Sequence, residues 1–419
     1  MYPYSYKFRS NYRGRRKKRK IIIIIIAVIL VILAAAAFFL YKKGFFAGKD
    51  DIKADDTMAS LTETDGEDET REEMIISSSL PPPVKVKGIY VTGWSAGSAG
   101  KLDHFIELCD ATEINALVID IKDDRGQITF QSDIAPGSAA ITNIIRNPAE
   151  MVSRLKEHDI YAIAKIVCFK DPIWSSENPE LAIKDKQGNS WKDNNGNTWL
   201  NPYETKTWDY LVKVAREAAK LGFDEVQFDY VRFPTDGKIG EIDYGDIAED
   251  KPKMIVIGEF LEYAREELKN DGIYISADVF GIIAVSQVDS MTIGQDLETV
   301  AQCVDYICPM IYPSHYANKR QNGVGQNING ILFEAPDLKP YDVIYNTLIL
   351  IKERTSYLYE TAIVRPYLQD FTASYLGAGY YQVYGAKQVK EQIQAVYDAG
   401  YEEWILWNAS NTYSEDAFR

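Results

Sequence analysis

The sequence is poor in the residues that bind metals and form disulfides. Its 419 residues include only three histidines and four cysteines, and they contain no HExxH, paired CxxC, P-loop or GxGxxG motif. Zinc, nucleotide and dinucleotide chemistry therefore have no motif support, and we expect no metal ion and no cofactor. Three of the four cysteines lie in or beside strand-like runs, so we expect buried thiols rather than a disulfide framework. The four are Cys109, Cys168, Cys303 and Cys308.

A basic surface stripe is also lacking. The formal net charge is −15, and the densest basic run, "RGRRKKRK", occupies residues 13–20. The rest of the chain is therefore more acidic still, which argues against nucleic acid as a partner.

One long hydrophobic run stands at the N-terminus. The stretch from Ile21 to Tyr41 carries no charge, and at about 1.5 Å per residue it would span roughly 30 Å, the thickness of a bilayer core. Because the basic run precedes it, the positive-inside rule predicts a cytoplasmic tail at residues 1–20, a signal anchor at 21–41 and a single-pass protein whose remainder faces outward. The alternative is a cleaved signal peptide, with Ala34 to Ala37 as the cleavage region.

Residues 42–83 are acidic and rich in Pro and Ser towards their end. Such a segment cannot bury enough apolar surface to fold, so we expect an extended linker. We expect the folded domain to occupy residues 84–419.

Within that domain, short apolar runs alternate with amphipathic segments, the pattern of a parallel α/β sheet. Eight such units in one domain predict a (β/α)8 TIM barrel, and a doubly wound sheet is the alternative. Helices are expected in segments starting near residues 101, 148, 207, 254 and 386. The predicted strands are 86–94, 116–124, 161–169, 224–231, 273–281, 304–312, 362–370 and 402–410.

The stretch "FDEVQFDYVRFP", residues 223–234, places Gln227 and Asp229 on one face of a buried strand. In a barrel that face points inward, and catalytic groups lie at the carboxyl ends of the strands. Ser276 and Asp278 share a face on the next strand in the same way. Several carboxylates converging on one rim favour a site. The pair that the pattern favours as catalytic is Asp229 and Asp278.

Other polar and aromatic residues fall late in the strands and are candidates for substrate binding. They are Trp94, Lys122, Asp124, Arg232, Tyr312, His315, Arg365 and Trp407. Structural alternatives stay open: ion pairs of Asp229 with Arg232 or of Asp120 with Lys122 would hold strand ends together. Asp120, Asp124 and Asp370 fit either role, and core packing is the alternative for the aromatic residues.

The longest expected loop runs from Lys170 to Glu204 and carries Trp174, Trp191 and Trp199 among Asn, Asp and Gly. Long loops are frequently functional, which suggests a sugar-binding wall. A surface hairpin whose tryptophans cover its own edge is the alternative. A second insertion, 314–340, could form the opposite wall.

The motifs "VKGIYVTGWSAG", "NALVIDIKDDRGQI", "GFDEVQFDYVRFP", "ISADVFG", "CPMIYPSHY" and "VRPYLQDF" resemble, in order, a bacterial glycoside hydrolase family known as domain of unknown function 4015. The resemblance covers nearly all of residues 84–419. It implies a TIM barrel distantly related to α-amylases and α-galactosidases. In those relatives a strand-four aspartate is the nucleophile, which matches Asp229. The glutamate that acts as acid/base in the amylase type falls at Asp278, one methylene shorter.

Cleavage of a glycosidic bond needs one carboxylate to attack or activate water and a second, with a raised pKa, to protonate the leaving oxygen. Asp229 and Asp278 could supply both groups. We therefore expect a membrane-anchored extracellular glycoside hydrolase that acts on a polysaccharide or oligosaccharide. The alternative is a carbohydrate-binding or envelope protein on a degenerate, non-catalytic barrel.

Overall fold

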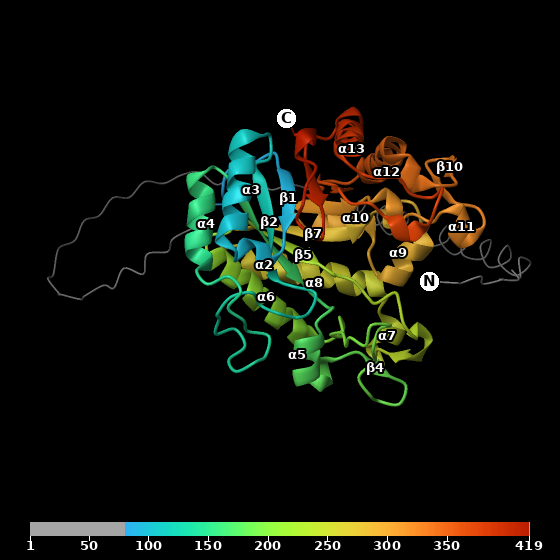
Figure 1. The fold of residues 1–419 in the computed structure, drawn as a ribbon. Coiled ribbons are helices and arrows are strands. Elements are labelled where there is room, and N and C mark those ends of the chain that lie inside the picture. Colours follow the sequence, from blue (N-terminus) through green and yellow to red (C-terminus); the bar gives the residue numbers. More distant parts are fainter. Residues whose placement is uncertain (1–79, 419) are drawn as a thin grey trace, which may run out of the picture. The chain divides into compact units, whose positions relative to one another are not determined.

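The computed structural model describes residues 80–418, and within them the chain forms a closed barrel of parallel strands (Figure 1). The strand order is β8, β12, β13, β1, β2, β3, β5, β7, and a further pairing of β7 with β8 closes the ring. All eight predicted strands are confirmed, and so is the TIM barrel. The strands are β1 (Lys87–Val91), β2 (Ala116–Lys122), β3 (Tyr161–Val167), β5 (Glu225–Asp229), β7 (Tyr274–Phe280), β8 (Tyr306–Met310), β12 (Tyr367–Gln369, preceded by β11, Ile363–Val364) and β13 (Trp404–Trp407).

Helices surround the barrel, and the five predicted helical segments are confirmed. Each has apolar residues at intervals of three and four, so one face packs on the strands. Two more, α10 and α12, were not among the predicted segments. The outer helices are α3 (Ala99–Ala111), α4 (Pro148–Glu157), α6 (Thr205–Lys220), α8 (Lys253–Leu268), α10 (Leu297–Cys303), α12 (Pro340–Thr355) and α13 (Ala386–Asp398).

Two hydrophobic clusters follow from the alternation of side chains along each strand. The larger one fills the space between strands and helices and includes Val226 and Phe228 of β5. The smaller one lies inside the barrel and includes Tyr90, Tyr312 and Tyr367. All four cysteines are free and buried, as predicted.

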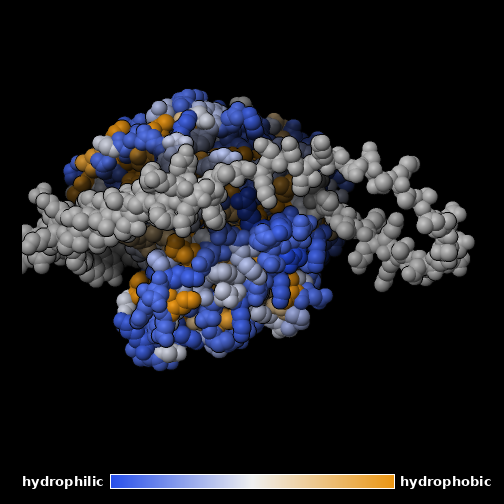
Figure 2. All heavy atoms as spheres, turned by 180° about the vertical axis from the view of Figure 1, so that it is seen from behind, coloured by the Kyte–Doolittle hydropathy of each residue, from blue (hydrophilic) through white to orange (hydrophobic). Residues whose placement is uncertain are grey.

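Two insertions extend the loops that follow the strands. After β3 come α5 (Pro172–Glu177) and β4 (Lys184–Asp185), and β4 pairs with β6 (Ile242–Asp243), which follows β5 near α7 (Ile247–Asp250). These parts form a lobe at one end of the barrel (Figure 1). The face of this lobe seen in Figure 2 is mostly hydrophilic. The insertion after β8 contains α11 (Lys319–Asn322) and the hairpin β9 (Gln326–Ile328) and β10 (Ile331–Phe333).

The described chain starts beside the amino ends of the strands. The hydroxyl of Tyr274, the first residue of β7, donates to the carbonyl of Pro81 at 3.0 Å, and Val84 packs against the interior cluster. The last residues of the predicted linker therefore belong to the folded domain. Within residues 80–418 no helix is both long and apolar enough to cross a bilayer. The predicted tail, signal anchor and most of the linker lie outside the described residues.

Candidate active site

Four ionisable side chains from four neighbouring strands meet at the carboxyl mouth of the barrel. Asp120 comes from β2, Lys165 from β3, Asp229 from β5 and Asp278 from β7, and all four are buried. Each belongs to the inward face of its strand, as the alternation within "VQFD" predicted for Asp229. The barrel thus brings together groups that lie more than 150 residues apart in sequence.

Lys165 is the centre of this group. Its Nζ lies 2.7 Å from Oδ2 of Asp229 and 3.2 Å from Oδ1 of Asp120. Burial lowers the pKa of Lys165, but the charges of Asp120 and Asp229 outweigh this effect and raise that pKa well above its usual value. The hydroxyl of Tyr90 donates to the other oxygen of Asp120 at 2.5 Å. The ammonium group is therefore a permanent cation shared by two carboxylates.

The backbone at the end of β5 also fixes the carboxylate of Asp229. Its Oδ1 accepts a hydrogen bond from the backbone N–H of Tyr230 at 2.6 Å. Tyr230 has φ of 48°, in the left-handed region, which is uncommon for a residue other than glycine. Backbone strain of this kind concentrates at functional sites. The turn after β5 thus fixes the direction of the carboxylate.

Asp278 differs from Asp229 in environment. It is 1% exposed, and its Oδ1 has no hydrogen-bond partner in the described structure. Burial, followed by the negative charge of Asp229, raises the pKa of Asp278 well above its usual range. The two carboxyl groups therefore lie in different environments: Asp229 pairs with the ammonium group of Lys165, whereas the raised pKa of Asp278 favours its protonated form.

Aromatic rings line the mouth next to these charges. Trp407 of β13 is half-buried and stacks on Tyr90 with ring centres 6.0 Å apart. Tyr312, which is buried, lies 5.8 Å from Trp407 and 4.9 Å from His315, which is exposed. Three predicted ligand contacts, Tyr312, His315 and Trp407, thus gather at one part of the rim, and the ring of Trp407 is only half-buried there.

The structure contradicts the prediction that Lys122 binds substrate. Lys122 is fully buried, and its Nζ lies 2.8 Å from Asp171 and 5.8 Å from the ring centre of Tyr210 on α6. The register of β2 shifts between Asp120 and Lys122, and this irregularity breaks the alternation on which the prediction depended. The proposed Asp120–Lys122 ion pair is wrong for the same reason.

The predicted role of Arg365 is also wrong. Arg365 does face the barrel interior, but at the opposite end: it forms ion pairs with Glu225, the first residue of β5, at 2.9 Å and with Glu403 at 2.8 Å. All three are buried. Alternation gave the correct face, but it does not determine the depth along the barrel.

Arg232 and Asp124 lie close to the mouth. Arg232 is not the partner of Asp229; its guanidinium lies about 5 Å from the rings of Trp199, Tyr230 and Phe280, and burial lowers its pKa. Asp124 is exposed and pairs with Lys170 at 2.8 Å. Burial raises the pKa of Asp124, but the hydrogen bond and charge of Lys170, together with the charges of Lys165 and Arg125, outweigh this effect and lower that pKa overall.

The tryptophans of the long loop do not form an open sugar-binding wall. Trp191 and Trp199 are 4% and 1% exposed, and their indole N–H groups donate to the Lys238 carbonyl and to Asp193. Trp174 stacks on Tyr210 at 4.5 Å. These residues pack inside the insertion and against neighbouring segments, so they are structural, but they cover more than the edge of one hairpin. Asp370 is likewise structural, because Ser414 donates two hydrogen bonds to its carboxylate.

Sequence reasoning missed Lys165 and Tyr90. Lys165 is the one charged residue in the strand "YAIAKIV", and Tyr90 lies late in "KGIYV" on its inward face. A lone charge inside a buried strand is a signal that would have identified Lys165.

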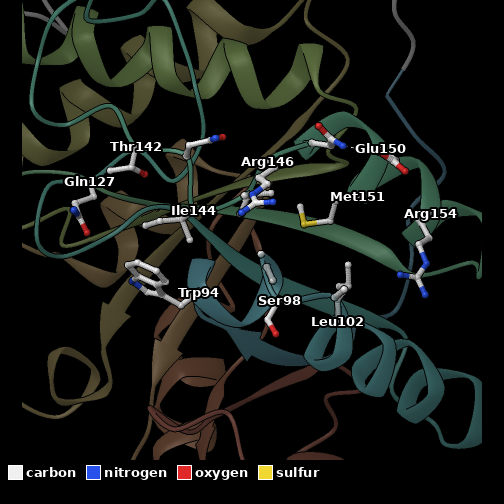
Figure 3. A pocket seen from close by; sticks show the side chains of 16 residues that line it. Trp94, Ser98, Leu102, Gln127, Thr142, Ile144, Arg146, Glu150, Met151 and Arg154 are labelled. Carbon is white, nitrogen blue, oxygen red and sulfur yellow. Dashed lines mark hydrogen bonds between the residues drawn. The ribbon is translucent and has the colours of Figure 1, made fainter.

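Trp94 lies outside the barrel mouth. It belongs to the short helix α2 (Gly93–Ala96), directly after β1, and is 62% exposed. It lines one side of a cleft of about 900 Å³ that also contains Arg146 and Arg154 (Figure 3). The predicted contact thus belongs to a neighbouring hollow.

A barrel with two carboxyl groups at its mouth, one ion-paired and the other with a raised pKa, is typical of glycoside hydrolases. A family model described as "Putative glycosyl hydrolase domain", domain of unknown function 4015, matches residues 88–413. The chain belongs to this family, and its class is glycoside hydrolase. No curated protein matches the sequence.

Two solved structures agree with the fold, and a third is similar in sequence over part of the chain. The glycoside hydrolase domain of PgaB (BpsB) from Bordetella bronchiseptica has a TM-score of 0.58 at 12% identity, covering 80% of this chain and 98% of its own. A β-galactosidase from Marinomonas ef1 has a TM-score of 0.53 at 10% identity, covering 78% and 54%. A hypothetical protein from Ruminiclostridium thermocellum is 43% identical over 46% of this chain and 97% of its own, with a TM-score of 0.43.

Proposed function

We propose that the protein hydrolyses a polysaccharide, with Asp229 as the nucleophile and Asp278 as the proton donor. The observation that carries the proposal is the contrast between the two groups: Asp229 lies 2.7 Å from a lysine ammonium group, whereas the pKa of buried Asp278 is raised. One group attacks as a carboxylate, and the other delivers a proton to the leaving oxygen.

The arrangement of the strands supports a retaining mechanism. Phe228 pairs with Ala277, so Asp229 and Asp278 are the next residues on adjacent parallel strands. Neighbouring strands are about 4.8 Å apart, which is near the separation of roughly 5–5.5 Å between the carboxyl groups of retaining enzymes. Asp229 would form a glycosyl ester while the proton of Asp278 leaves with the aglycone. Water would then cleave the ester, with Asp278 as base.

We place this activity outside the cell on the basis of the sequence. The basic run at residues 13–20 followed by the uncharged stretch 21–41 supports a single-pass anchor with the catalytic domain outside. Polysaccharide of the cell surface or of the surroundings is the substrate that such a location offers.

The test is to screen the full-length chain against 4-nitrophenyl glycosides and polysaccharides, and then to assay Asp229→Asn on whatever is cleaved. Loss of the nucleophile should reduce turnover by several orders of magnitude. Azide should restore turnover to Asp229→Gly and yield a glycosyl azide. The matched control is Asp370→Asn, a buried rim aspartate held by Ser414, which should keep its turnover.

The second candidate function is carbohydrate binding on a non-catalytic barrel. It is favoured by the 1% exposure of Asp278, since a proton donor must reach the substrate oxygen. If saccharides bind and none is cleaved, the binding function replaces the catalytic one. If Asp229→Asn and Asp278→Asn both retain full turnover, the assignment of these two residues as catalytic is wrong.

A further inference from the structure

The cleft that contains Trp94 has no role in the chemistry proposed above. Its walls come from α2, the start of α3, the loop after β2 and the first turns of α4. In Figure 3, Trp94 lies at one end of the hollow, Arg154 at the other, and Arg146 between them. At about 900 Å³ the cleft is large enough for more than one sugar ring.

Trp94 presents an unoccupied aromatic face to this cleft. Its side chain is 62% exposed, whereas Trp191, Trp199 and Trp404 are buried. A large flat ring stacks well on the apolar face of a sugar. Gln127 and Asn143, which line the same cleft, supply amide groups that can bind sugar hydroxyls.

Arg146 supplies a cation without a partner. The other arginine of the cleft, Arg154, forms an ion pair with Asp103 at 2.6 Å. Arg146 is exposed and has neither an ion pair nor a hydrogen bond within residues 80–418. A free guanidinium group at the wall of a cleft suits a carboxylate, because its planar fork can donate two parallel hydrogen bonds.

The helix that carries Trp94 packs against the strand that carries Asp120. Gly93, the neighbour of Trp94, packs so closely on β2 that a Cβ atom there would lie 3.0 Å from the carbonyl oxygen of Asp120 and 2.5 Å from Thr129. Asp120 shares Lys165 with Asp229. A glycan chain that leaves the mouth between β1 and β2 would therefore pass over Trp94.

We propose that this cleft binds the substrate chain beyond the cleaved bond, and that the chain carries carboxylate groups, as uronic acids do. The proposal rests on the proposed function and names its substrate class: an acidic polysaccharide whose ring stacks on Trp94 and whose carboxylate pairs with Arg146.

The experiment measures binding rather than turnover. Full-length chain carrying Asp229→Asn runs on native gels that contain polygalacturonate, alginate or hyaluronate, and on a gel with fully methyl-esterified polygalacturonate. We expect retardation by at least one acidic polymer. Adding Trp94→Ala or Arg146→Gln should weaken that binding about tenfold. Matched controls are Tyr359→Ala, an aromatic residue that is 84% exposed, and Lys390→Gln on α13, which should bind unchanged.

Each outcome has a defined meaning. Failure of all three acidic polymers to bind, or binding that survives both cleft substitutions, would overturn the inference. If Arg146→Gln has no effect and the esterified polymer binds equally well, the inference that the substrate carries carboxylate groups is wrong. Hydrolysis by Asp229→Asn tests the proposed function separately, because binding to this cleft does not require the nucleophile.

Discussion

At the residue scale, the mouth of the barrel depends on one cation. Lys165 lies within 3.2 Å of both Asp120 and Asp229 and is buried with them. Replacing it by methionine leaves two neighbouring carboxylates without a counter-charge. We expect Lys165→Met to lower the free energy of unfolding by about 3–5 kcal/mol, as loss of one partner of a buried pair does. Denaturant unfolding measures this.

Lys319→Met is the matched control, because Lys319 pairs with Glu334 and both side chains are exposed. Such pairs contribute little to stability. Equal losses in the two variants would contradict the central role of Lys165.

The raised pKa of Asp278 predicts a pH-dependent stability. At pH values between its unfolded pKa, about 3.9, and its higher folded pKa, the folded protein holds a proton that the unfolded chain releases. Stability is therefore lost as pH rises through this window. Asp278→Asn cannot lose a proton at this position. The melting temperature of this variant minus that of the wild type should therefore increase as the pH rises from about 4 to about 8. A constant difference across that range would show that Asp278 is not shifted.

The residue pattern predicted part of this site and could not predict the rest. Alternation along β5 and β7 identified Asp229 and Asp278 as inward residues at the carboxyl ends of their strands. It could not show that Lys165, rather than Arg232, reaches Asp229, because the partner is set by the stagger of neighbouring strands. The prediction for Arg365 failed because alternation gave the correct, inward face of its strand but not its position along the barrel axis.

At the scale of the elements, the end of β5 is strained. Tyr230 adopts φ of 48° while its ring lies 4.8 Å from the guanidinium of Arg232 and 4.9 Å from Lys170. Tyr230→Ala and Tyr230→Gly both remove the ring, but only glycine adopts this backbone without cost. We expect the glycine variant to be more stable than the alanine variant by about 1 kcal/mol. Thermal unfolding compares them, and an alanine variant of equal or greater stability would exclude the strain.

We expect the tryptophans of the insertion after β3 to stabilise the fold rather than to bind substrate. Since Trp199 is 1% exposed and bonds to Asp193, Trp199→Ala should cost about 3–5 kcal/mol of stability. Trp94→Ala, which removes an exposed ring, should change the melting temperature little. A small loss for Trp199→Ala would mean that the insertion unfolds independently of the barrel.

Eight strands could be read from the sequence because each is a short, almost continuous apolar run. The irregularity in β2 could not, since no glycine or proline marks it, and it turned Lys122 away from the mouth. The role of the loop tryptophans was equally open, because burial by a neighbouring segment such as β6 depends on contacts distant in sequence.

At the scale of the whole molecule, the described chain begins at the end of the barrel opposite to the two carboxyl groups. The described chain enters along Leu80–Val86, where Pro81 accepts a hydrogen bond from the first residue of β7. Asp229 and Asp278 lie at the other end of the strands. Residue 80, where the described part of the chain begins, therefore lies at the end of the barrel away from the mouth.

This separation makes the topology testable together with function. Protease added to intact cells should release a soluble fragment that begins within residues 44–83, because the sequence there is acidic, poor in large apolar groups and outside the predicted span. The fragment should keep the saccharide binding of the full-length chain, since it retains the barrel strands and the residues of the proposed site. N-terminal sequencing and affinity gels measure both properties, and cells opened before proteolysis serve as the control. Complete protection of residues 44–83 on intact cells would contradict the outward topology, whereas release with loss of binding would show that residues before the cut contribute to saccharide binding.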